Sequence, residues 1–187
     1  VPFTHLTAKK VRAIIDHLKK GEPIDSLFEL PDTNIRYSPT QEKTIFFKDF
    51  TSGTSLEKLA NISPEEVIGL IKDSRLKGCG GAFFPTGIKW ELCRNNLSDQ
   101  KYIICNADES EPLIFKDRTL IDTNPHQLLE GMIIGGYACG ASEAWIYIRG
   151  EYEYQARRLE EAIKESEKKN LLGENILNSG FSFKIHV

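Results

Sequence analysis

The second half of the chain alternates strand patterns with helix patterns, and this alternation constrains the fold more than any other feature. Short apolar runs are separated by longer segments in which apolar residues recur at helical spacing. The pattern predicts strands over Tyr102–Cys105, Ala144–Ile148 and Phe181–Val187, and helices over Pro125–Cys139 and Glu151–Lys169. Strand and helix in alternation imply a mostly parallel sheet with helices packed on it. We therefore predict an α/β fold with a Rossmann-like, mostly parallel sheet and flanking helices.

The first third of the chain has a different pattern. Leu6–Lys20 carries apolar residues at helical spacing after Thr7, a residue type that caps helices, so we expect an amphipathic helix. Gly21–Phe50 holds several prolines among turn residues, and only Thr44–Phe47 suggests a strand. This segment is predicted to be an extended connector or arm.

A second unit is expected to begin at Ser63. The serine can cap a helix, Pro64 fits the first helical position, and Glu66 completes a capping box. A helix to about Arg75 follows. The predicted division is residues 1–62 as an N-terminal helix and connector, and residues 63–187 as an α/β domain.

Composition and charge limit the classes of function. The chain has 187 residues, a formal net charge of -3 and no basic stretch beyond short pairs such as Lys9-Lys10, which predicts no nucleic-acid binding. No apolar run reaches the length of a membrane span, and the N-terminus lacks a signal-peptide pattern. We therefore expect a soluble, cytoplasmic protein without direct membrane insertion.

The four cysteines do not form a recognisable metal site. They are Cys79, Cys93, Cys105 and Cys139, with neither the close pairs of a zinc site nor the clustering that holds iron and sulfur. Cys105 and Cys139 lie in apolar runs and are expected to be small buried hydrophobes. We predict no metal bound by this chain alone.

Two segments suit a nucleotide-like ligand. Leu76–Trp90 reads LKGCGGAFFPTGIKW and places four glycines, which let a backbone approach a ligand closely, before Lys89. Asn106–Arg118 reads NADESEPLIFKDR and follows the strand predicted at Tyr102–Cys105, where ligands sit in open α/β sheets. The glycine-rich segment is not a dinucleotide fingerprint, because it follows a helix and carries Phe83 at the third glycine position.

These segments resemble the NADH-binding flavoprotein subunit of respiratory complex I, the 51 kDa type, and its relatives in NAD-linked hydrogenases and formate dehydrogenases. That family usually reads LRGRGGAGFPTGLKW and NADEGEPGTFKDR. The resemblance continues through Asp122–Gly140, Ala144–Glu151 and the tail to Val187. It implies an FMN-binding part of an NADH dehydrogenase module that passes electrons from NADH to iron–sulfur subunits of a multi-subunit oxidoreductase.

The resemblance also implies roles for individual residues, all of them in binding and none in acid–base or nucleophilic catalysis. The loop that lines the flavin matches Gly78, Gly80, Gly81 and Ala82, and a cation near the flavin matches Lys89. Polar contacts to the isoalloxazine ring and ribityl chain match Asn106 and Asp108. The acidic pair around the nicotinamide matches Glu109 and Glu111, and an aromatic that packs on the adenine matches Phe84.

The residues taken alone leave plainer interpretations open. A lysine before a tryptophan is usually a surface residue, although Lys89 follows a turn of glycine and proline that calls for no lysine. Glu109, Glu111 and nearby Asp117 suit a solvated loop as well as a ligand. Phe84 suits a core position as well as a ligand contact.

The chain departs from the family pattern at the implied site. The family arginine is replaced by Cys79, and two family glycines are replaced by Phe83 and Ser110. Leu113-Ile114 stand in place of a glycine-threonine pair, and Leu92 stands in place of an aromatic residue. Loss of an arginine removes a fixed cation with several donors, and a phenylalanine ring occupies space beside the backbone. The alternative function is therefore a non-catalytic or incomplete homologue with a structural role and no nucleotide binding.

The family pattern extends beyond this sequence. In the family, a further flavin-site segment, a ubiquitin-like domain and a helical domain with a 4Fe-4S cluster follow the position of Val187. The cluster is therefore expected only in a missing C-terminal part or in partner subunits. We expect either a fragment or a fold that another polypeptide completes, with the strand at Phe181–Val187 incompletely covered.

Overall fold

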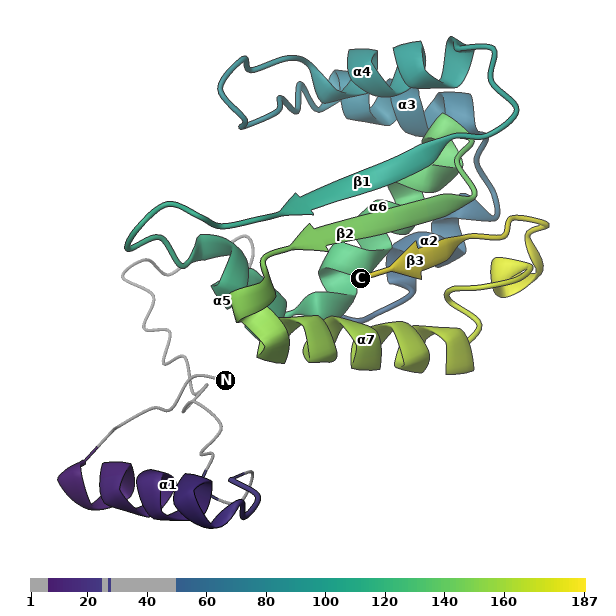
Figure 1. Cartoon of the computed structure of the whole chain (residues 1–187). Coiled ribbons are helices and arrows are strands. Elements are labelled where there is room, and N and C mark those ends of the chain that lie inside the picture. The colour runs from purple at the N-terminus through teal and green to yellow at the C-terminus, as the bar shows by residue number, and fades with distance from the viewer. Residues whose placement is uncertain (1–6, 25–26, 28–49) are drawn as a thin grey trace. The chain divides into compact units, whose positions relative to one another are not determined.

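The computed structural model describes residues 7–24, 27 and 50–187 (Figure 1). The chain divides into two compact units, Val1–Glu42 and Lys43–Val187. The strand predicted at Thr44–Phe47 and most of the predicted connector lie outside the described residues.

The first unit contains helix α1, Ala8–Lys20, which confirms the predicted amphipathic helix. The Thr7 side chain accepts a hydrogen bond of 3.2 Å from the backbone N–H of Lys10, so it caps the helix as expected. Gly21 ends the helix in the left-handed conformation with φ of 66°.

The second unit contains the sheet and the remaining elements. Its helices are α2 Thr54–Leu59, α3 Pro64–Asp73, α4 Thr86–Asn95, α5 Lys116–Thr123, α6 Pro125–Cys139 and α7 Glu153–Lys168, its strands are β1 Tyr102–Ala107, β2 Glu143–Ile148 and β3 Lys184–His186, and its 3-10 turns are η2 Gly150–Tyr152 and η3 Ile176–Asn178. The strands are parallel, in the order β1-β2-β3. This arrangement confirms the predicted α/β fold.

Two helix starts show why the local sequence predicts these elements. Ser63 accepts from the backbone N–H of Glu66, and the Glu66 carboxylate accepts from the backbone N–H of Ser63 at 2.6 Å, which is the predicted capping box. Helix α6 begins at Pro125, as expected, and ends before Gly140 in the left-handed conformation.

The structure corrects three details. The strand predicted over Phe181–Val187 is shorter, because Phe183 exchanges backbone hydrogen bonds with Gly173 in an antiparallel bridge instead of pairing with β2. Helices α2, α4 and α5 were not predicted, because short segments without apolar periodicity give little local signal. Lys89 therefore lies within helix α4 and not at the end of a turn.

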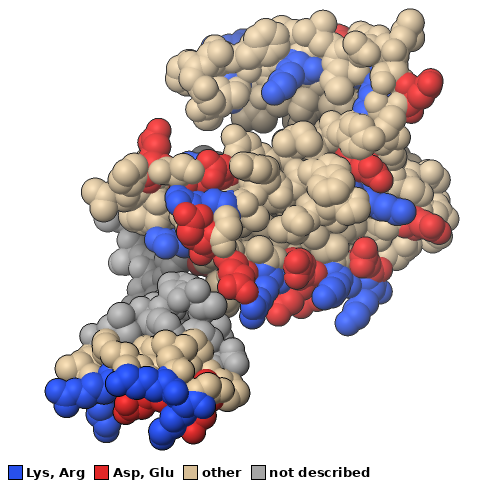
Figure 2. All heavy atoms as spheres, in the orientation of Figure 1, with Lys and Arg blue, Asp and Glu red and all other residues tan. Residues whose placement is uncertain are grey.

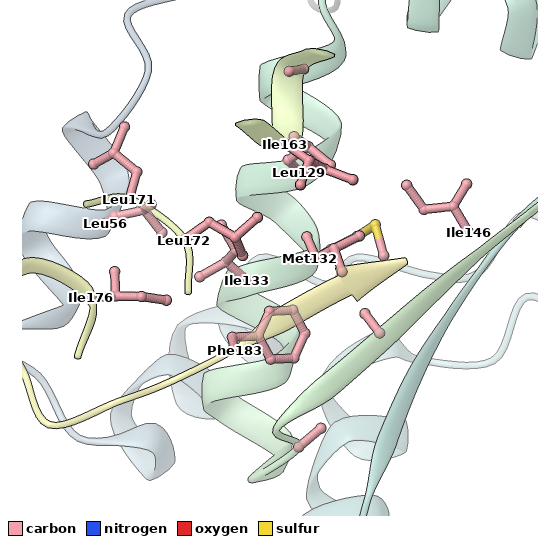
Figure 3. Packing of buried hydrophobic residues seen from close by; sticks show 14 of the residues in the cluster. Leu56, Leu129, Met132, Ile133, Ile146, Ile163, Leu171, Leu172, Ile176 and Phe183 are labelled. Atoms are coloured by element: carbon pink, nitrogen blue, oxygen red, sulfur yellow. The ribbon is translucent and has the colours of Figure 1, made fainter. Parts of the chain in front are cut away.

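One face of the sheet carries the core. Helix α6 packs against β1 and β2, and α7 packs against α6. Leu129, Met132 and Ile133 of α6 share one buried cluster with Ile146 and Phe183; Met132 lies on the side of the helix that faces Ile146, and Ile133 lies beside Leu172 (Figure 3). A side chain at Gly136 would place its Cβ 2.3 Å from the Phe183 ring, so this glycine lets the helix approach the sheet closely.

The opposite face of the sheet is open. Side chains alternate across β1 and β2, which places Tyr102, Ile104, Trp145 and Tyr147 on this face with between 47% and 66% of their surface exposed. Figure 2 shows this uncharged area beside a hollow below α4, whereas charged side chains gather along α7. A contiguous exposed apolar surface of this kind is typical of an interaction or ligand-binding site.

Within the described ranges, no helix is long and apolar enough to cross a membrane. No group of three or more histidine, cysteine or acidic side chains in the same part of the chain is placed to hold a metal ion.

Candidate cofactor-binding site at the carboxyl ends of the strands

The glycine-rich segment forms a closed loop between α3 and α4. The backbone N–H of Gly78 donates to the Phe84 carbonyl and that of Thr86 to the Leu76 carbonyl, each at 2.9 Å. These bonds close the base of the loop, so its tip, residues 79–83, extends into solvent (Figure 1). Gly81 at the tip has φ of 109°, a conformation that glycine adopts without strain.

The loop leads directly into helix α4. Gly87, the second residue of α4, is buried where a Cβ would lie 2.7 Å from the backbone nitrogen of Lys72, so α3 and α4 approach closely there. No side chain caps the amino end of α4. The side chain of Lys89 lies exposed near this end and forms no hydrogen bond or ion pair with the described residues. The loop, the helix end and the lysine together favour an anionic ligand.

The second segment follows β1 and turns sharply at its carboxyl end. The backbone N–H of Asp108 donates to Asn106 Oδ1 at 3.1 Å, and the Ser110 hydroxyl donates to Asp108 Oδ2 at 2.6 Å. Asn106 and Glu111 are exposed, and Asp108 is half-buried. Glu111 makes no side-chain bond within the described part of the chain. Three of the four predicted polar side chains of this segment are therefore accessible to a ligand.

Glu109 differs from its neighbours, because only 4% of its surface is exposed. Its carboxylate accepts hydrogen bonds from the backbone N–H of Asp117 at 2.7 Å and of Arg118 at 3.2 Å, at the start of α5, and from the Tyr152 hydroxyl at 3.1 Å. Burial raises the pKa of Glu109, but these donors and the Lys116 charge outweigh it and hold the pKa below its ordinary value. The carboxylate is thus an ionised cap of α5.

Residues after β2 complete the site, and sequence reasoning gave them no role. Ile148 pairs with Ala107, so the residues that follow the two strands are neighbours. Arg149 donates to the Glu109 carbonyl oxygen at 2.7 Å and holds the Glu151 carboxylate through two nitrogens. Hydrogen bonding to Arg149 lowers the pKa of Glu151 to about 2. The predicted parallel sheet was the signal that could have found this segment, because ligands bind at the carboxyl ends of neighbouring parallel strands.

The structure brings some predicted residues together and leaves others apart. Asn106, Asp108, Glu109 and Glu111 form one group at the carboxyl ends of β1 and β2. The glycine-rich loop, with Ala82 and the half-exposed Phe84, lies at the same end of the sheet (Figure 1). No hydrogen bond or ion pair joins it to residues 106–118 where the chain is described. The space between them is open, and Figure 2 shows the surface hollowed there.

Two other hollows lie at the opposite end of the sheet. One is lined by Arg94, Tyr137 and Ser142 among others, and the second by Glu143, Glu174 and Lys184 among others. Neither contains a residue of the candidate site. Their lining combines a few charged side chains with small residues and carries no arrangement typical of catalysis.

Comparison with known proteins identifies this arrangement. The sequence profile of the Complex1_51K family, described as the Nuo51 FMN-binding domain, matches residues 71–187. The chain belongs to this family. The matched range begins in α3 and includes both segments of the candidate site and the whole sheet. The resemblance predicted from the sequence is confirmed.

Individual relatives agree with the family assignment. An NADH-quinone oxidoreductase subunit of Aquifex aeolicus is 55% identical over 133 residues, covering 71% of this chain and 31% of that protein. The NAD-reducing hydrogenase HoxS subunit alpha of Cupriavidus necator is 41% identical over 199 residues, covering 100% of this chain and 33% of that protein. The chain thus spans about a third of the length of these relatives.

A solved structure supports the fold. A chain of an NAD+-reducing [NiFe]-hydrogenase, determined in the H2-reduced state, superposes with a TM-score of 0.74 and 30% sequence identity. The superposition covers 98% of this chain and 31% of the hydrogenase chain.

Proposed function

We propose that this chain binds FMN and takes part in NADH oxidation as the flavin-binding part of a multi-subunit oxidoreductase. The carrying observation is the placement of both family segments at one end of a parallel sheet, with a hollow between them. Ligands bind at this end of open α/β sheets. The relatives are named as subunits of NADH-quinone oxidoreductase and NAD-reducing hydrogenase, which supports a role in a similar assembly.

The residues present fit a flavin mononucleotide. A Cβ at Gly80 or Gly81 would meet no atom within 4 Å, so the loop backbone is open to a ligand. Gly78, Gly80, Gly81 and Ala82 would line the flavin, and Lys89 would lie near its negative charge. Bound FMN would accept a hydride from NADH and release electrons one at a time.

The remaining residues would orient the two ligands. Asn106 and Asp108 would bind the ring and ribityl chain, and Phe84 would pack on the adenine of NADH. Of the two glutamates expected around the nicotinamide, exposed Glu111 would contact the ligand directly, whereas Glu109 would act from its buried position beneath the loop. The chain's contribution is orientation and electrostatics, without a protein nucleophile.

The partners we propose are iron–sulfur subunits of the same assembly, and the location is the cytoplasm. Electrons from a flavin need an acceptor, and the described residues hold no group of metal ligands. A 4Fe-4S cluster would lie in a partner or in another part of the polypeptide.

NADH-dependent reduction of ferricyanide, with FMN added, tests this function. The parent chain is expected to show activity that requires FMN, and Asp108→Ala should lower it by about tenfold or more because a ligand contact is lost. Asp99→Ala, on the exposed loop before β1, is the matched control and should leave activity unchanged. Activity that Asp108→Ala does not alter would contradict the assigned site.

A second function, a structural homologue without nucleotide binding, is favoured by one observation. Phe83 and Leu113 stand where the family pattern has glycine, and both have a left-handed backbone, with φ of 51° and 68°. Their side chains therefore occupy positions where the family has none. Activity absent from the parent and restored by Phe83→Gly would support this second function.

A further inference from the structure

Arg149 occupies a position from which it can control the loop after β1. It directly follows β2, and Ile148 at the end of β2 pairs with Ala107 at the end of β1. The parallel register therefore sets the Arg149 side chain beside the segment that begins at Asp108. Only 27% of this side chain is exposed.

All three guanidinium nitrogens of Arg149 are engaged. Nε and Nη2 bind the two carboxylate oxygens of Glu151 at 3.1 and 2.7 Å, and Nη1 donates to the carbonyl oxygen of Glu109 at 2.7 Å. The Glu151 carboxylate fixes the plane of the guanidinium, so the third nitrogen is aimed at the loop. A lysine has a single ammonium and cannot hold a carboxylate bidentately while donating in a fixed third direction.

The residue that Arg149 holds is itself anchored through its side chain. Glu109 binds the backbone N–H groups of Asp117 and Arg118 and the hydroxyl of Tyr152. The Tyr152 ring contacts two cations, with the guanidinium carbons of Arg118 and Arg149 at 5.7 and 5.6 Å from its centroid. Glu109 is therefore held at its backbone carbonyl by Arg149 and at its carboxylate by three hydrogen-bond donors.

We propose that Arg149 is a positioning residue that holds the loop 108–111 in its ligand-binding conformation by clamping the Glu109 carbonyl. The inference rests on the proposed function, because that function assigns ligand contacts to Asp108 and Glu111, which lie on either side of the clamped Glu109 carbonyl. Release of the carbonyl would let half-buried Asp108 and exposed Glu111 move, while the core beneath α6 stays unchanged.

The direct test is amide hydrogen exchange in the ligand-free chain, followed by NMR. The amides of Asp117 and Arg118 report on Glu109, because both donate to its carboxylate. Arg149→Met is expected to accelerate their exchange by about tenfold, the effect of one charged hydrogen bond, while amides of α6 change by less than about twofold. Arg149→Lys should not restore the parent rates. Equal acceleration everywhere, or none at Asp117 and Arg118, would overturn the proposal.

A second readout is FMN affinity. Arg149→Met and Arg149→Lys are each expected to weaken FMN binding by about tenfold. Arg157→Lys is the matched control, because Arg157 pairs with Glu153 on the exposed side of α7, away from the loop. Should Arg149→Met fail to fold, Tyr152→Phe removes one Glu109 bond and should accelerate the same two amides.

The two claims can fail separately. A parent chain that binds no FMN would contradict the proposed function, while the exchange rates would still decide the role of Arg149. A parent that binds FMN with the same affinity as both Arg149 variants would overturn the positioning role and leave the proposed function standing.

Discussion

The carboxylate of Glu130 in α6 accepts a hydrogen bond of 2.8 Å from the backbone N–H of Gly53, 77 positions earlier in the chain. A second bond of 3.0 Å comes from the backbone N–H of Ser55, so Glu130 caps the amino end of α2. Glu109 does the same for α5. Two buried glutamates thus satisfy helix ends that have no side-chain cap of their own, Glu130 from a distant part of the chain and Glu109 from the loop just before α5.

Glu130→Ala is expected to destabilise the chain by about 2–4 kcal/mol, because it leaves one buried and one half-buried N–H group without partners. Urea denaturation followed by circular dichroism measures the change. Glu57→Ala, on the exposed side of α2, is the control and should change stability by less than about 0.5 kcal/mol. An unchanged midpoint for Glu130→Ala would show that α2 does not depend on this cap.

Glu109 should make stability depend on pH. Its folded pKa lies below the ordinary value of 4.5, so its contribution is fully present above that value and is lost as pH falls through the folded pKa. Glu109→Gln should therefore lose less stability than the parent between neutral pH and about pH 3. Asp122, whose pKa is raised by burial, acts in the opposite direction in both proteins, so comparing the two isolates Glu109. Parallel stability curves would contradict this role.

Phe83→Gly and Leu113→Gly should each stabilise the chain by up to about 1 kcal/mol. A left-handed residue with a side chain costs about 1–2 kcal/mol, which exceeds the entropic cost of glycine. Little packing is lost, since 63% of Phe83 and 96% of Leu113 is exposed. Phe84→Gly, at a neighbouring position without positive φ, is the control and should destabilise. Thermal unfolding that ranks all three variants below the parent would refute the strain argument.

The open face of the sheet should bind a hydrophobic dye and promote association at high concentration. Trp145 stacks on His186 at 4.4 Å between ring centroids, and Ile104 and Tyr147 extend the apolar area. The double variant Ile104→Thr and Tyr147→Thr should reduce dye fluorescence and light scattering without lowering the unfolding temperature. Leu97→Ser, at a fully exposed loop position, should change neither. Equal dye binding by the parent and the double variant would show that the dye does not bind to this face of the sheet, and would contradict the prediction.

Local sequence patterns predicted the α/β fold, and the features that they did not predict depend on tertiary contacts. Helix α6 was predicted to its observed bounds, because Pro125 starts it and Gly140 ends it. The predicted length of β3 was wrong, because the pairing of Phe183 with Gly173 depends on a turn that no local pattern specifies. Asn106 and Asp108 could be proposed from sequence, whereas the burial of Glu109 and the clamp by Arg149 required strands 40 positions apart to be brought together.

Equilibrium dialysis of FMN against the chain decides whether this site takes a flavin. We predict saturable binding of one FMN per chain, tightened by Phe83→Gly because the loop backbone becomes accessible, and tightened further by Cys79→Arg through a charge-assisted contact worth about 1.5–3 kcal/mol. Asp108→Ala should weaken it. Absence of saturable FMN binding in both the parent and the Phe83→Gly variant would contradict the assignment of this site to a flavin.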